Sequence, residues 1–213
     1  METRIYLIRH GESLGNQARL MLGHTDRDLS LMGYRQAERT AKELSDVHFD
    51  AIYSSDLIRA HNTAKPHAAL RGMEVITRRD LREIYVGEWE NMGVEDIISG
   101  YGELFTVGWR ANFGVFTPPG GESAEHARER FYNAVVDIAK KHEGGTVLIT
   151  AHAAVIRLFF GKIRKIAPEE LGAAFFYPSN ASYSIAVYDG ETVTPVSYSN
   201  DEHLADISTP FAP

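Results

Sequence analysis

The chain has 213 residues, of which 44% are hydrophobic and 24% charged, so it can bury a core without disulfide or metal staples. It has no cysteine, which excludes a disulfide framework, a thiolate metal site and a cysteine nucleophile. The formal net charge of −7 argues against broad binding to nucleic acid or anionic lipid, so we expect neither partner, although a local positive pocket is compatible with it.

Strand and helix patterns alternate along most of the chain. The first apolar run, within a strand expected over 4–9, is too short for a signal sequence or a membrane span, so we expect no membrane partner and a cytoplasmic protein. The later elements expected, in chain order, are a helix over 30–45, a strand over 49–54, a helix over 55–70 that Pro66 kinks or splits, a strand over 74–77, a helix over 123–142, a strand over 146–150, a helix over 154–162 and a hairpin over 184–198.

The helix over 30–45 has the clearest start signal. Ser30 is expected to be its N-cap. Residues at helical spacing are expected to form its buried face, namely Leu31, Tyr34, Ala37, Ala41 and Leu44.

Alternating strands and helices predict an α/β fold with a mostly parallel central sheet covered by helices on both faces. No repeat or Pro/Gly/Ser linker interrupts the pattern, so we expect a single domain over 1–213. The segment 89–119 fits badly, because aromatic residues alternate with glycines there without clear periodicity. It is either a surface excursion with its own small core or a cap that faces the substrate.

Basic side chains follow the ends of separate strands. Arg9 and His10 follow the first strand, and His152 follows the strand over 146–150. Arg59 lies on the helix after the strand over 49–54. Ligands of parallel α/β sheets bind outside the carboxyl ends of the strands, so these four side chains are expected to converge.

Such a cluster is suited to an anion. The arginine fork matches phosphate or carboxylate, and an imidazole among arginines is kept neutral and nucleophilic. A neutral imidazole beside phosphorus can form a phosphohistidine. Asn16 either adds a neutral donor or is a turn residue. Zinc is the rival ligand for paired histidines, but nearby arginines would repel it and no HExxH spacing occurs, so we expect no metal and no cofactor.

A phosphate ester also needs an acid to protonate the departing oxygen. The stretch over 81–90 supplies three carboxylates, Glu83, Glu88 and Glu90, and composition alone does not choose among them.

Six blocks of the sequence, in order, carry a resemblance to a known family. They are LIRHGES followed by Asn16, GHTDRDLSLMGYRQA, YSSDLIRAHNTA, LREIYVGEWE, PGGES and ITAHAAVIR. Together they resemble the histidine phosphatase superfamily, which has the phosphoglycerate-mutase-like fold. The resemblance implies a three-layer α/β fold with a mostly parallel sheet and a small inserted cap, here at about 89–119.

The resemblance also implies roles for particular residues. His10 is similar to the nucleophile that becomes phosphorylated, and Glu83 to the proton donor that later activates water. Residues similar to the rest of the phosphate pocket are Arg9, Asn16, Arg59 and His152.

Two departures from the family pattern bear on function. His152 is followed by Ala153 and Ala154 where His-Gly-Gly is common, but the Ala153 N–H can still donate to phosphate. No RRSYDxPPP-like insertion, which the cofactor-dependent mutases carry, lies between Glu90 and Gly121. We therefore expect a metal-independent phosphomonoester hydrolase acting on a small phosphorylated metabolite. The alternatives are a phosphoglycerate-type mutase and a non-catalytic phosphate-binding protein. In the cap, Trp109, Phe113 and Phe116 favour an apolar or aromatic-bearing substrate.

Overall fold

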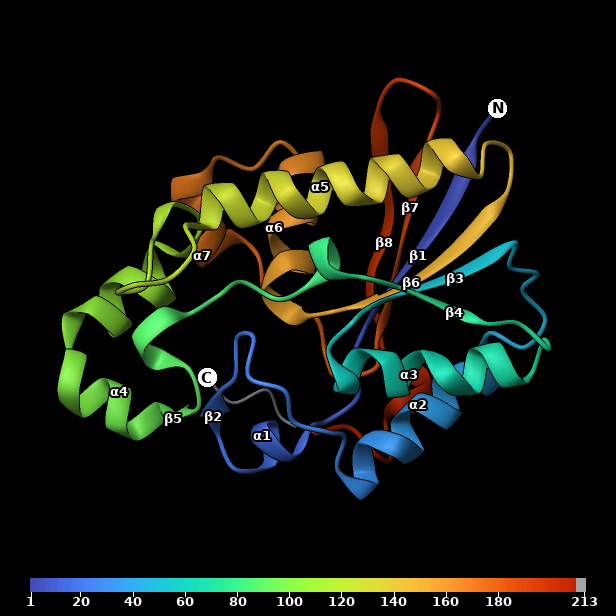
Figure 1. The fold of residues 1–213 in the computed structure, drawn as a ribbon. Helices are drawn as coiled ribbons and strands as arrows, with labels where there is room; N and C mark the ends of the chain where they lie inside the picture. Colours follow the sequence, from blue (N-terminus) through green and yellow to red (C-terminus); the bar gives the residue numbers. More distant parts are fainter. Residues whose placement is uncertain (210–213) are drawn as a thin grey trace.

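The computed structural model describes residues 1–209, and its core is a six-stranded sheet (Figure 1). The strand order is β4-β3-β6-β1-β7-β8. The first four strands of this order are mutually parallel, whereas β7 runs antiparallel to both β1 and β8. The strands are β1 (Thr3–Arg9), β3 (Ala51–Ser55), β4 (Val75–Arg78), β6 (Thr146–Ala151), β7 (Tyr183–Tyr188) and β8 (Val193–Asn200).

Helices cover both faces of the sheet, which confirms the three-layer α/β fold (Figure 1). Helices α2 (Leu31–Glu43) and α3 (Ile58–Ala69) lie on one face, and α5 (Ala124–Lys141) and α6 (Ala153–Ile163) on the other. No helix in the described range is long and apolar enough to cross a membrane. The short elements are α1 (Leu14–Gln17), β2 (Leu20–Met21), β5 (Met92–Gly93), α4 (Val94–Tyr101), a π-helix (Leu104–Ala111), α7 (Leu171–Ala174) and 3₁₀ turns at Arg79–Leu81, Gly87–Trp89, Phe113–Val115, Pro168–Glu170 and Glu202–Leu204.

Helix α2 begins where the sequence predicts but buries a different face. The Ser30 Oγ accepts the Gly33 N–H at 3.0 Å, as expected of an N-cap. Leu31 and Tyr34 are 84% and 37% exposed, so the expectation that they lie in the core is wrong. The reason is close approach of backbone: a Cβ on Gly33 would lie 2.0 Å from the Glu12 carbonyl oxygen. A stripe of small residues therefore faces inward.

Helix α3 contains Pro66 but is one continuous helix, so the expectation that the proline splits it is wrong. The Leu70 N–H still donates to the Pro66 carbonyl at 3.1 Å, which keeps the last turn intact. The helix begins at Ile58, with Leu57 as N-cap, slightly later than the sequence indicates.

The segment 89–119 extends from one end of the molecule and contains β5, α4 and the π-helix (Figure 1). Strand β5 pairs antiparallel with β2, so the segment is joined to the loop that follows β1. Its aromatic rings pack edge to face, with ring centroids 6.1 Å apart for Trp89–Trp109 and 5.0 Å apart for Trp109–Phe113. These rings belong to the same hydrophobic cluster as Ile5 in the sheet.

Candidate active site

The two histidines after strand ends lie together because β1 and β6 are neighbours. These strands run parallel with Arg9 opposite Ala151, so His10 and His152 leave the sheet side by side. Their ring centroids are 5.2 Å apart and the planes are inclined by 61°. Both side chains are buried.

The hydrogen bond of His10 defines which ring nitrogen is reactive. Its Nδ1 lies 2.7 Å from the Gly11 carbonyl oxygen, which can only accept, so Nδ1 carries the proton. A neutral ring then keeps its lone pair on Nε2. Burial, followed by the charges of Arg59 and Arg9, lowers the pKa of His10 well below its ordinary value. His10 is therefore neutral at pH 7, with a lone pair on Nε2.

His152 lies behind His10 as the N-cap of α6 and does not line the pocket itself. Burial, and then the charge of Arg59, lowers its pKa well below the ordinary value. Within the described residues, neither of its ring nitrogens has a hydrogen-bond partner.

Backbone carbonyls hold the two arginines in place. Arg9 Nη1 donates to the Pro178 carbonyl at 2.7 Å. Arg59 donates from Nη1 to the Thr25 carbonyl at 2.9 Å and from Nη2 to the Gly23 carbonyl at 2.8 Å. Burial lowers the pKa of each guanidinium to about 10, so both remain cationic at pH 7. Two buried positive charges therefore flank the neutral His10.

Glu90 fixes the loop that holds Arg59. Its Oε1 accepts the His24 N–H at 2.8 Å, and its Oε2 accepts the Thr25 N–H at 2.6 Å. Both oxygens of the Glu90 carboxylate are therefore bonded to this loop. Glu88 instead is exposed and accepts the hydroxyl of Tyr101 at 3.0 Å.

Glu83 is the carboxylate that lines the pocket, at the N-terminus of α6. Its Oε1 accepts the Ile84 N–H at 2.9 Å and the Val155 N–H at 3.2 Å. Its Oε2 accepts the Ala154 N–H at 3.0 Å. The first N–H of the helix, on Ala153, lines the pocket and has no hydrogen bond to any other described residue. This helix end therefore presents a donor to an anion.

Asn16 is oriented by its neighbours. Its Oδ1 accepts the Ser13 N–H at 3.1 Å and the Asn180 Nδ2–H at 3.4 Å. Because the oxygen is engaged, the amide nitrogen is the end that can donate to a ligand. Asn180 also donates to the His10 carbonyl at 3.1 Å, which connects Asn16 to the end of β1.

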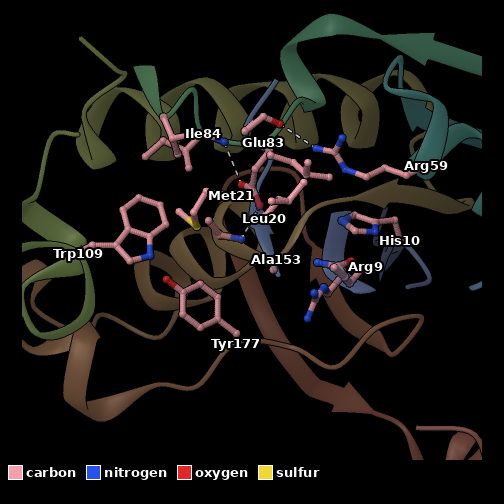
Figure 2. A pocket seen from close by; sticks show the side chains of 15 residues that line it. Arg9, His10, Leu20, Met21, Arg59, Glu83, Ile84, Trp109, Ala153 and Tyr177 are labelled. Atoms are coloured by element: carbon pink, nitrogen blue, oxygen red, sulfur yellow. Dashed lines mark hydrogen bonds between the residues drawn. The ribbon is translucent and has the colours of Figure 1, made fainter. Parts of the chain in front are cut away.

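The pocket that these residues form has a cavity of about 70 Å³ and two unlike ends (Figure 2). Arg9, His10 and Arg59 lie at the polar end, and the polar part of the lining also includes Asn16, Glu83 and Ala153. Met21, Ile84, Trp109 and Tyr177 lie at the apolar end, and the apolar part of the lining also includes Leu20, Leu22 and Val86. Of these apolar residues the sequence indicates only Trp109. Of the three aromatic residues that the sequence links to an apolar or aromatic-bearing substrate, only Trp109 lines this cavity, whereas Phe113 and Phe116 do not.

Neutral imidazoles and buried guanidiniums lie together at the carboxyl edge of a mostly parallel sheet. This combination of fold and site is typical of an enzyme that acts on phosphate esters through a histidine. A family model described as histidine phosphatase superfamily (branch 1) matches residues 5–201. The chain belongs to that family.

The curated relatives carry names of two activities, phosphatase and mutase. The chain is 33% identical to "Phosphoserine phosphatase 1" of Hydrogenobacter thermophilus over 85% of both chains. It is 30% identical to a 2,3-bisphosphoglycerate-dependent phosphoglycerate mutase of Cytophaga hutchinsonii, over 78% of this chain and 80% of that one. The structure of Bacillus stearothermophilus YhfR is similar with a TM-score of 0.89, at 31% identity, over 95% of this chain and 99% of that one.

Proposed function

We propose that the chain is a metal-independent phosphatase that hydrolyses small phosphomonoesters through a phosphohistidine at His10. The observation that carries this proposal is the neutral imidazole of His10 between two buried guanidiniums. Its Nδ1–H donates to the Gly11 carbonyl, which leaves the lone pair on Nε2 available to attack phosphorus. Guanidiniums would bind the phosphoryl oxygens, and the imidazole would attack phosphorus.

In the first step, Arg9, Arg59 and the Ala153 N–H bind the phosphoryl oxygens, with Asn16 as a further contact, while His152 packs against the His10 ring. The Nε2 of His10 forms the bond to phosphorus while the bond from phosphorus to the ester oxygen breaks. Glu83 donates its proton to that oxygen, so the product leaves as a neutral alcohol. Three backbone N–H groups donate to the Glu83 carboxyl oxygens and hold the carboxyl group in place beside the pocket.

In the second step, the Glu83 carboxylate takes a proton from water as the water oxygen attacks phosphorus. The bond between phosphorus and Nε2 breaks, which releases inorganic phosphate and restores neutral His10. Glu83 now carries the proton taken from water and can donate it to the next ester. The same residue thus serves as acid and then as base.

Chelation is expected to leave the activity unchanged. Two guanidiniums stand where metal ligands would be needed, and the described residues include no group of three His, Asp or Glu side chains that could hold a metal ion. Vanadate should inhibit, because it resembles the five-coordinate phosphoryl group. The measurement is phosphate release in EDTA and with added vanadate. Activity lost in EDTA and restored by zinc or magnesium would contradict this site.

Free phosphate is expected to be the main product with phosphoglycerate, which distinguishes a phosphatase from a mutase. The chain has no mutase-like insertion between Glu90 and Gly121, so water should reach the phosphohistidine. Phosphate release and the interconversion of 2- and 3-phosphoglycerate would be measured on the same samples. Efficient interconversion with little free phosphate would establish the mutase function instead, and no turnover of any ester would favour a phosphate-binding protein.

The remaining expectations belong to the same proposal. The segment 89–119 would be a cap on one domain, because its aromatic residues share a hydrophobic cluster with the sheet. A cytoplasmic location and the absence of a nucleic-acid partner are supported by the acidic net charge and the lack of cysteine.

A further inference from the structure

We infer that the preferred substrate of this site carries a neutral, largely apolar alcohol with one hydrogen-bond acceptor, which the indole N–H of Trp109 recognises. The inference rests on the proposed function, because it concerns the part of the ester that leaves. It assigns Trp109 as a residue that determines specificity.

Trp109 reaches the pocket from the π-helix of segment 89–119. It is only 4% exposed, and its ring packs against Trp89 and Phe113. In Figure 2 it lies across the cavity from His10 and Arg59, beyond Met21, with Tyr177 beside it. The distal end of a substrate whose phosphoryl group sits at His10 would therefore meet this indole.

The indole N–H is a buried donor without an acceptor. Within residues 1–209, Nε1 of Trp109 has no hydrogen-bond partner. Tryptophan N–H groups usually find a partner when buried, and an unmade bond is costly. The cavity that Trp109 lines is where the missing acceptor can enter.

Much of the cavity lining is apolar, and Met21 and Ile84 lie toward Trp109 in Figure 2. The other apolar side chains of the lining are Leu20, Leu22 and Val86. The cations that line the cavity, Arg9 and Arg59, belong to its phosphate end. A carboxylate or an ammonium on the alcohol would lose its hydration at the apolar end without a counter-charge on the wall. Phosphoserine, which carries both groups, fits this end poorly.

Tyr177 does not change the charge of the apolar end. Burial raises the pKa of its hydroxyl to about 12, so the group is neutral at pH 7. The guanidinium of Arg157 lies 4.2 Å from the centroid of the Tyr177 ring, and its Nη2 donates to the Leu171 carbonyl at 2.8 Å. Arg157 is not among the residues that line the cavity, so its charge stays behind the tyrosine ring.

The test compares esters of matched size in wild type and two variants. Benzyl phosphate has no acceptor on its ring, whereas the three pyridylmethyl phosphates place a nitrogen acceptor at successive positions. In wild type, kcat/KM for at least one pyridylmethyl isomer should exceed that for benzyl phosphate by about fivefold, which is typical of one neutral hydrogen bond. Both should exceed phosphoserine and 3-phosphoglycerate by at least about tenfold, because those esters bring unpaired charge.

Trp109→Phe keeps an aromatic ring and removes the donor. It should abolish the preference, so that kcat/KM for benzyl phosphate and for the pyridylmethyl isomer become equal. Trp89→Phe is the matched control, since Nε1 of Trp89 is also buried without a partner among the described residues but Trp89 does not line the cavity. This variant should keep the preference.

Three outcomes would overturn the inference while phosphatase activity stands. They are a preference for phosphoserine or phosphoglycerate, equal rates for benzyl and all pyridylmethyl esters, and equal effects of the two tryptophan substitutions. If wild type released phosphate from no ester, the proposed function would fail. Calorimetric binding of benzylphosphonate and pyridylmethylphosphonates to wild type and Trp109→Phe would then decide the role of Trp109 separately, with the same preference expected.

Discussion

His10→Ala is expected to lower phosphatase turnover by at least about 10⁴-fold, because the covalent route through the imidazole is lost. Wild-type protein, mixed rapidly with a ³²P-labelled ester and quenched without acid, should carry an acid-labile phosphoryl group on His10. The variant should carry none. Wild-type enzyme has a neutral Nε2 ready at pH 7, since the pKa of His10 lies well below its ordinary value. His10 should therefore not need to lose a proton before it is phosphorylated near neutral pH.

His61→Ala provides a control for removing a histidine near the site. His61 lies on α3 two positions after Arg59, but it does not line the pocket. Labelling and turnover of this variant should match wild type. A His10→Ala protein that folds, as judged by circular dichroism, and still turns over rapidly would rule out the covalent mechanism.

Glu83→Gln is expected to slow phosphorylation of His10 by about 10²–10⁴-fold with alkyl phosphates but only mildly with nitrophenyl phosphate. An alkyl ester expels a strongly basic alkoxide that needs a proton during bond breaking, whereas nitrophenolate needs little help. Glutamine has nearly the same shape, and its carbonyl oxygen can still accept the Ile84 and Val155 N–H groups, although the Ala154 N–H loses its acceptor. Single-turnover experiments are required, because Glu83 also assists the hydrolysis step that both substrates share.

Glu90→Gln is the matched control for that experiment. Glu90 bonds to the His24 and Thr25 N–H groups and so acts on the phosphate only through the loop that holds Arg59. Its loss should therefore slow both classes of ester by the same factor. Equal slowing by Glu83→Gln would mean that Glu83, too, merely supports the pocket.

Local pattern was enough to predict the sheet and most helix positions, but not which face of α2 is buried. Helical periodicity considers only the hydrophobicity of side chains, so it placed Leu31 and Tyr34 on the buried face. The decisive feature was the contact between the backbone at Gly33 and that at Glu12, two segments whose approach is set by tertiary packing. A sequence shows that a glycine is present but not which backbone comes near it.

The basic side chains of the pocket were foreseeable because Arg9 and His10 lie at the end of β1 and Arg59 lies in the first turn of the helix after β3. The apolar end was not. Leu20 and Met21 lie on β2, whose partner β5 is far along the chain, so no local repeat marks them. Trp109 lies in a π-helix, whose i to i+5 bonding does not give the 3.6-residue spacing that identifies helices. The choice among Glu83, Glu88 and Glu90 likewise needed three-dimensional contacts.

The π-helix at Leu104–Ala111 is a place where a small change in chain length would change the substrate specificity of this site. A π-helix bonds from i to i+5 and holds one residue more in each hydrogen-bonded turn than an α-helix, so deleting one residue before Trp109 would change which side chain faces the cavity. The phosphate-binding groups come from other stretches of the chain and would be untouched. A single change in chain length could thus alter which alcohols are accepted while the phosphoryl chemistry is inherited intact.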